Sequence, residues 1–139
     1  MANEFLRNRQ DADVNPAAKA LPASAGSIET DPIDLGPGAN RGLKRLELEV
    51  QAPALNTTEL PNAATTTYDM EHSDTSGSGY VDLALGIGVQ TGAGGIGALA
   101  ANFRYGLPGD VKRFVRVQAT SASTPGDQSA KTVKLVAMF

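Results

Sequence analysis

The densest group of potentially reactive side chains lies within six residues, at Asp69, Glu71, His72 and Asp74. Carboxylates and an imidazole can hold a divalent metal or move protons. Residues 65–73, however, alternate polar and apolar side chains in the manner of a β-strand, which directs Asp69 and Glu71 to one face and His72 to the other. Two carboxylates on one face are typical of a solvated rim, so the sequence predicts no metal site here.

A glycine-rich segment, Gly92 to Gly97, fits the pattern G-x-G-x-x-G and follows a strongly alternating segment. A dinucleotide-binding turn needs a helix of roughly ten residues next, and an acidic residue about 20 positions further on. Residues 98–105 are too short for that helix before Pro108, and Asp110 comes too early. The segment is therefore interpreted as a flexible loop.

Other kinds of catalytic site find little support. His72 is the only histidine, and the serines beside it lack the nucleophile elbow of a hydrolase. Glu47 and Glu49 fall on the wet face of one predicted strand, which suits solubility. There is no cysteine and no tryptophan. We therefore expect a protein that is not an enzyme, with no catalytic residues, no cofactor and no metal.

The size and charge of the chain narrow its partners. The 139 residues suffice for one domain with one core. The net charge of −3 offers no field to attract nucleic acid. No stretch approaches the ~20 apolar residues that span a bilayer, and residues 1–10 lack the apolar run of a secretory signal. We expect a soluble product that binds neither nucleic acid nor membrane.

The chain is predicted to have two parts. Residues 1–25 show no sustained period and contain Pro16 and Pro22, so they are interpreted as an N-terminal arm. This arm is either a frayed terminus or a segment that becomes ordered on a neighbouring subunit. Residues 26–139 are predicted to form the β domain, because short alternating runs there are bounded by Gly, Pro, Asn and Asp.

The β domain contains seven or eight short strands and no convincing amphipathic helix. This pattern predicts an all-β fold, an antiparallel β-sandwich or jelly roll with an extended N-terminal arm. Pro32 interrupts the first strand and suggests an edge or a bulge. Both faces of the last strand carry apolar residues, so it is expected to lie between layers. The predicted strands are residues 27–35, 43–52, 65–73, 80–90, 99–105, 111–120 and 132–139.

The clearest alternation is in the strand at residues 80–90. One face is expected to be buried at the centre of the core. The opposite face carries small residues, which let another backbone approach closely, either a second layer of this chain or a partner. The apolar face comprises Val81, Leu83, Leu85, Ile87 and Val89, and the opposite face Asp82, Ala84, Gly86 and Gly88.

The order of several short motifs resembles a known family. The motifs are Asp34-Leu35-Gly36, the strand Leu46–Val50, the Tyr68…Glu71-His72-Ser73-Asp74 strand and turn, and Leu107-Pro108 before Arg113-Phe114-Val115-Arg116-Val117. Together they resemble the jelly-roll decoration (cement) proteins of tailed bacteriophage heads. The resemblance covers about residues 26–139 and is distributed over the chain.

The resemblance implies a structural virion protein on the capsid exterior, made in the host cytoplasm. It would bind the major capsid protein, cement contacts between capsid subunits, and form a homo-oligomer, a trimer. On this hypothesis the contacts made by the arm are Phe5, Leu6, Arg7 and Arg9.

Two other functions stay open. One is a ligand- or glycan-binding β-sandwich of a phage tail or fibre, with a sugar near Asp69, Glu71 and Tyr80, although aromatic residues are only 5% of the chain. The other is an enzyme on a jelly-roll scaffold, for which the cupin type of metal site would need several histidines.

Overall fold

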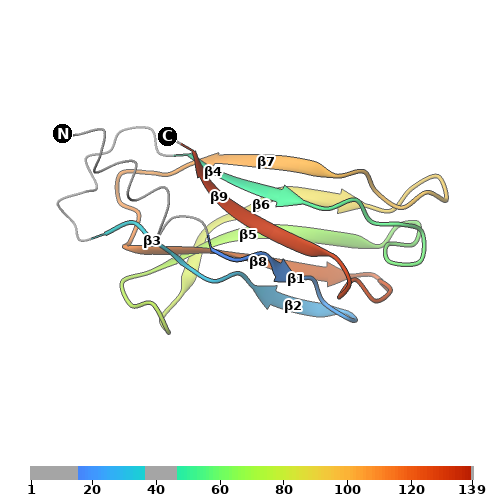
Figure 1. Cartoon of the computed structure of the whole chain (residues 1–139), viewed down its shortest axis with the longest axis horizontal. Helices are drawn as coiled ribbons and strands as arrows, with labels where there is room; N and C mark the ends of the chain where they lie inside the picture. The colour runs from blue at the N-terminus through green and yellow to red at the C-terminus, as the bar shows by residue number, and fades with distance from the viewer. Residues whose placement is uncertain (1–15, 37–46, 139) are drawn as a thin grey trace.

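The computed structural model describes residues 16–36 and 47–138. These residues form two antiparallel sheets packed face to face, with strands along the long axis of the molecule (Figure 1). One sheet has the strand order β1-β9-β4-β7, and the other has the order β2-β8-β5-β6 with β3 also paired to β8. The strands are β1 (Lys19–Ala20), β2 (Gly26–Glu29), β3 (Ile33–Asp34), β4 (Glu47–Ala52), β5 (Thr65–Ser73), β6 (Val81–Thr91), β7 (Ala101–Gly106), β8 (Phe114–Ala122) and β9 (Thr132–Met138).

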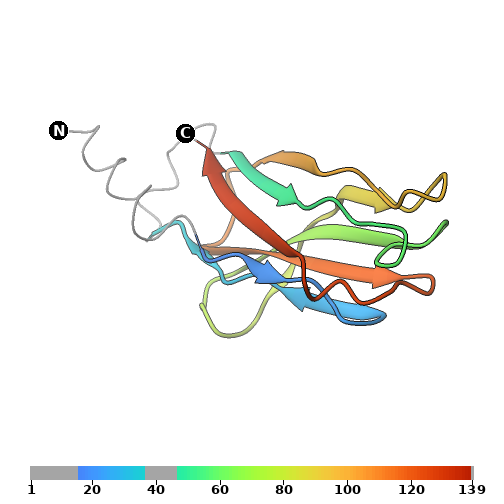
Figure 2. The same cartoon turned by 45° about the vertical axis from the view of Figure 1, so that its right-hand side comes forward.

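The strand order is that of a jelly roll. If β2 and β3 are counted as one interrupted strand, the first strand pairs with the eighth, the second with the seventh, the third with the sixth and the fourth with the fifth. Consecutive strands therefore cross between the sheets until the β5–β6 hairpin (Figure 2). This pairing defines the double Greek key of a jelly roll and confirms the predicted fold class.

The interruption between β2 and β3 occurs at Pro32, as predicted. Both pieces pair with β8, Glu29 with Gln118 and Ile33 with Val115. Between them the hydroxyl of Thr30 accepts a hydrogen bond from the Val117 N–H at 3.0 Å. The side chain of Thr30 thus supplies an acceptor where the regular ladder is broken.

The first strand begins within the predicted arm. Lys19 and Ala20 pair with Thr132 and Val133 of β9, and Leu21 is buried in the core. The boundary at residue 25 is therefore wrong for residues 19–21, because a two-residue edge strand has too few side chains to show a period. Residues 1–15 of the predicted arm lie outside the described residues.

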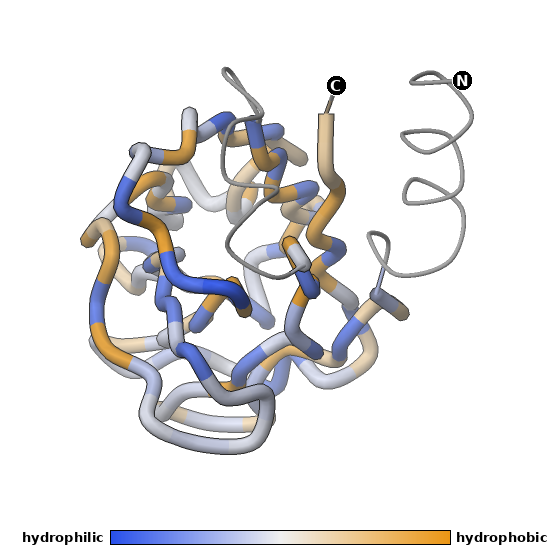
Figure 3. The backbone as a smooth tube through the Cα atoms, turned by 90° about the vertical axis from the view of Figure 1, so that its left-hand side faces the viewer, coloured by the Kyte–Doolittle hydropathy of each residue, from blue (hydrophilic) through white to orange (hydrophobic). Residues whose placement is uncertain are grey.

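The core lies between the sheets. Seen from the end of the molecule, hydrophobic and hydrophilic residues alternate along the backbone (Figure 3). Buried side chains come from both sheets, including Leu48 and Val50 of β4, Tyr68 of β5, and Val117 of β8. β9 is buried on one face only, while Val136 and Met138 on the other are half-buried. The expectation that the last strand lies between two layers is therefore wrong: it pairs within its sheet, between β1 and β4.

β6 does not occupy the centre of the core. It is the edge strand of its sheet, and Leu85 is 70% exposed while Val81 and Val89 are each 48% exposed. Gly88 and Gln90 face inward instead, opposite Tyr68 and Thr66 of β5. A Cβ at position 88 would lie only 2.2 Å from the ring of Phe103, so the aromatic ring occupies the space that the small residue leaves.

The alternation of β6 is also broken along its length. Register shifts fall between Tyr68 and Met70 and between Met70 and Glu71 of β5, where β6 contains extra residues. Gly86 has a φ of +61°, and its N–H donates to Oδ1 of Asp69 at 2.6 Å. Bulges change which face the following residues occupy. The five apolar residues of β6 therefore do not share one buried face.

Candidate functional site

The acidic cluster and His72 are taken up by structural contacts. Asp69 accepts the Gly86 N–H, and Glu71 accepts a hydrogen bond from Nε of Arg116 at 2.7 Å. Nδ1 of His72 accepts the N–H of Lys112 at 3.1 Å. Over residues 16–36 and 47–138, no group of three His, Cys, Asp or Glu is placed to hold a metal ion.

Arg116 contacts two of the three residues considered above for a sugar, Glu71 and Tyr80. Its guanidinium lies 3.8 Å from the ring centroid of Tyr80 and also pairs with Glu71. Burial raises the pKa of Tyr80, and the charge of Arg116 partly opposes that shift. The aromatic face of Tyr80 is thus covered by a cation from the same chain, and Asp69 is bonded to Gly86.

Two motifs of the family resemblance are brought together by another ion pair. Arg113 binds Asp34 through two hydrogen bonds, from Nε to Oδ1 at 2.7 Å and from the guanidinium NH₂ to Oδ2 at 2.8 Å. Oδ1 of Asp34 also accepts the Gly36 N–H. The Asp34-Leu35-Gly36 turn and the strand after Leu107-Pro108 are therefore fastened to each other.

The glycine-rich segment is a packed connection. Added Cβ atoms at Gly92 and Gly97 would lie 2.0 Å from the carbonyl oxygens of Pro61 and Leu55, respectively. Gly95 has a φ of +69°, and its N–H donates to Oδ1 of Asn62 at 3.0 Å. Gly92 and Gly97 permit the close approach of two loops, and Gly95 adopts a positive φ that residues with a side chain rarely adopt.

Glu49 was expected on a solvent-exposed face of its strand, but it is buried. It is 5% exposed, while its neighbour Glu47 is exposed as predicted. Oε1 of Glu49 accepts a hydrogen bond from Gln51, and Oε2 accepts one from Nε of Arg104. The bond from Gln51 and then that from Arg104 lower the pKa of Glu49.

A buried polar contact crosses the sandwich beside β6. The hydroxyl of Tyr68 donates to Oε1 of Gln90 at 2.7 Å, while Nε2 of Gln90 donates to the carbonyl oxygens of Pro53 and Leu99. Burial raises the pKa of Tyr68, which keeps it protonated as a donor. Tyr68 lies 22 residues and Pro53 37 residues from Gln90, so alternation alone offers no signal for these contacts.

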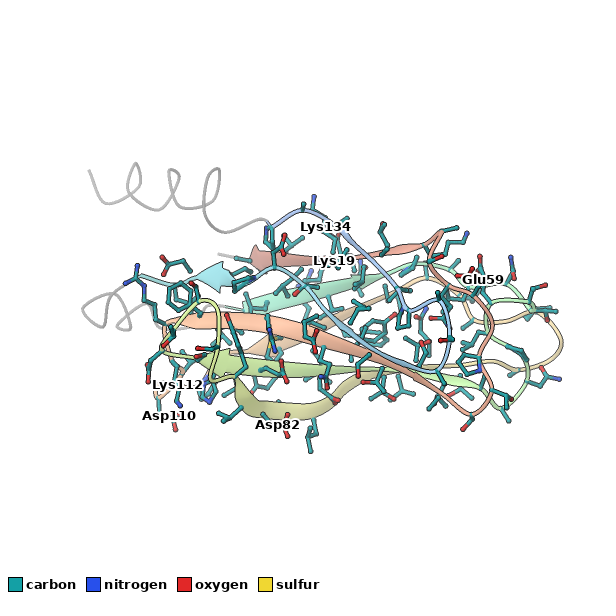
Figure 4. The ribbon with its side chains drawn as sticks, turned by 90° about the horizontal axis from the view of Figure 1, so that it is seen from below. Lys19, Glu59, Asp82, Asp110, Lys112 and Lys134 are labelled. Carbon is teal, nitrogen blue, oxygen red and sulfur yellow. The ribbon has the colours of Figure 1, made fainter. Side chains whose placement is uncertain are left out.

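Exposed apolar side chains gather on β6 and the connection after it. Among the described residues, the exposed large hydrophobic side chains are Val81, Leu85, Val89, Ile96 and Leu99, which we call the apolar edge. β6 and β7 are terminal strands of their sheets, and Phe103 of β7 packs over Gly88 of β6. Asp82, the one charged residue of β6, points away from the sandwich on the side opposite Lys19 and Lys134 (Figure 4). β6 thus carries several exposed apolar side chains and a single charged residue, Asp82.

The arm contacts named above, Phe5, Leu6, Arg7 and Arg9, lie outside the described residues. Within the part of the chain that the structure describes, no helix is long and apolar enough to cross a membrane.

No family model matches this chain, and no curated protein matches it. Among solved structures, that of Eiger TNF from S. frugiperda matches with 13% sequence identity over 91% of this chain and 94% of that chain, with a TM-score of 0.35. So low a TM-score supports no statement about function. The chain is therefore identified by its strand order, as an all-β jelly-roll sandwich.

Proposed function

We propose that this protein is a structural virion protein that binds the outside of a tailed-phage capsid and cements contacts between major capsid protein subunits. The observation that carries the binding role is the apolar edge, where Leu85 is 70% exposed on a terminal strand. Exposed apolar groups of this kind favour a protein partner. The choice of a phage head rests on the motif resemblance.

The internal contacts support a structural role. Ion pairs and hydrogen bonds engage Asp69, Glu71 and His72 within the fold. Among the described residues, every buried side-chain nitrogen and oxygen has a hydrogen-bond partner. These contacts lie within the fold, which fits a protein whose role is structural. We also propose that the arm contacts the capsid through Phe5, Leu6, Arg7 and Arg9. The proposed assembly of the protein is a homo-oligomer, the trimer that the family resemblance implies.

The test is co-sedimentation with expanded heads assembled from the major capsid protein of the same genome. A truncation should remove residues 1–15 only, because Lys19 to Leu21 belong to the sandwich. The truncated protein should keep its fold and occupy fewer sites at a given concentration. Many weak copies on a lattice make occupancy sensitive to each contact.

Leu85→Asp tests the apolar edge in the same assay, and its occupancy should fall by about tenfold or more, as for a central interface residue. Thr132→Asp is the matched control, because Thr132 is also exposed but lies on β9 of the other sheet. Absence of any binding by the wild-type protein to heads would refute the proposed function.

A further inference from the structure

One imidazole contacts the connection between β7 and β8, residues 107–113, whose last residue, Arg113, is bound separately to Asp34 and Leu35. Nδ1 of His72, on β5, accepts the N–H of Lys112 at 3.1 Å, and the side chain of His72 is nearly buried. Because Nδ1 accepts, the proton of the neutral ring must be on Nε2. The contact joins residues 40 positions apart.

This connection closes one end of the core. Val111 is buried, and its N–H donates to the carbonyl of Pro108 at 3.2 Å. Leu107 packs against the core from the same segment. Asp110 and Lys112 lie at this end of the molecule (Figure 4). Arg113 stays bound to Asp34 without His72, so loss of the His72 contact would loosen the part of the segment before Arg113, which covers apolar side chains.

The charged groups around His72 come from several elements. Lys112 and Asp110 belong to the connection itself, and Asp74 follows His72 on its own chain segment. On β8, Val115 pairs with His72, and the next charge, Arg116, is bound to Glu71. On β6, Val81 pairs with His72 and is followed by Asp82. The cation with the largest effect on the pKa of His72 is Lys112, whose backbone N–H also donates to Nδ1 of His72.

We infer that His72 is an acid-sensitive latch, which holds the β7–β8 connection on the sandwich when neutral and releases it when protonated. A proton on Nδ1 removes the lone pair that accepts the Lys112 N–H and places two donors face to face. It also places a positive ring beside the Lys112 side chain. The bond cannot survive in that form.

The direction of the pH dependence follows from the environment. Burial, and then the charge of Lys112, lower the pKa of His72, while Asp110 and Asp74 oppose the shift. The unfolded chain then binds the proton more readily than the folded chain. The stability from the neutral ring is complete above the ordinary pKa of about 6.5, and it is lost as the pH falls through the lower folded value.

Proton NMR of the full chain tests the titration directly. His72 is the only histidine, so one imidazole Cε1–H resonance reports it. We expect a pKa below the ordinary value in the wild type. Lys112→Gln should raise this pKa and Asp110→Asn should lower it, because both variants keep the backbone N–H. A wild-type pKa at or above the ordinary value would overturn the latch.

Hydrogen exchange tests the release. After correction for the intrinsic effect of pH, amides at residues 107–113 should lose protection several-fold between pH 7.5 and pH 5, while amides of β9 keep theirs. His72→Asn supplies an acceptor that does not titrate, so its connection should stay protected at both pH values. His72→Leu supplies none, so protection should be low at both.

Two results would contradict the inference: equal protection of residues 107–113 at the two pH values in the wild type, or an unchanged pH response in His72→Asn. If either histidine variant fails to fold, hydrogen exchange of the wild type at the two pH values still decides the release, and the opposite pKa shifts in Lys112→Gln and Asp110→Asn check the titration. A null result there overturns the latch.

Discussion

β5 and β6 are hydrogen-bonded neighbours in one sheet, yet they place their apolar side chains oppositely. β5 directs Tyr68 and Met70 into the core and Asp69 and Glu71 outward. β6 directs Gly88 and Gln90 inward and leaves Leu85 and Val89 exposed. The difference shows that apolar alternation alone does not decide which face of a strand is buried. The space that the opposite sheet leaves on each side of the strand also decides it.

A side chain of the opposite sheet limits the space next to β6. The ring of Phe103 lies over Gly88 and also contacts Tyr68, with ring centroids 5.7 Å apart. One aromatic side chain therefore fills the space above two strands. A large residue at position 88 would compete with it for the same volume.

Gly88→Val should give the largest effect, since its Cβ would lie 2.2 Å from the ring of Phe103. We expect a loss of about 3 kcal/mol in the free energy of unfolding, measured by urea denaturation. The double variant Gly88→Val/Phe103→Ala should recover part of that loss relative to the sum of the single changes. Strict additivity would show that the ring does not limit this face.

Tyr68→Phe should come next. It leaves Oε1 of Gln90 buried without its 2.7 Å donor, which typically costs about 1–3 kcal/mol. Chemical denaturation measures the loss. Tyr105→Phe is the control, because Tyr105 is only partly buried and lies on the facing sheet. Equal effects of the two changes would mean that the hydroxyl of Tyr68 adds nothing inside the sandwich.

Glu71→Gln probes the polar outer face of β5. The Arg116 side chain is 25% exposed and the Glu71 side chain 10%, so solvent screens the pair only in part, and we expect a loss of about 1 kcal/mol at low salt. The difference from wild type should shrink in 1 M NaCl. A large, salt-independent loss would instead indicate that shape at Glu71 matters more than charge.

Leu85→Ser should have the smallest effect on the free energy of unfolding, within about 0.5 kcal/mol, because Leu85 is exposed. Thermal unfolding at low protein concentration, monitored by circular dichroism, measures it. A loss comparable to that of Gly88→Val would mean that Leu85 belongs to the core and would end the contrast between the two strands.

Periodicity located the strands well because each is a local feature of the chain. Pro32 correctly marked the interruption between β2 and β3, and residues 65–73 match β5. The inward face of β6 could not be found in this way, because it depends on Phe103 of another sheet and on the bulge at Gly86.

The candidate site was only partly predictable. The opposite faces of Glu71 and His72 follow from strand geometry, as expected. Their partners Arg116 and Lys112 lie more than 35 residues away, and only the folded topology brings them close. The small residues Ala84 and Gly88 were the available sign that β6 meets another layer, although the sequence did not reveal that this face is the inner one.

The pairing of β1 with β9 bears on how the chain reaches its native state. Lys19 pairs with Val133, so this contact cannot form until synthesis has passed residue 133. Folds dominated by such distant pairings fold in milliseconds to seconds, more slowly than helical proteins of similar size. We therefore expect β1 to stay unpaired on the ribosome until β9 has emerged, and the first sheet to be completed only then.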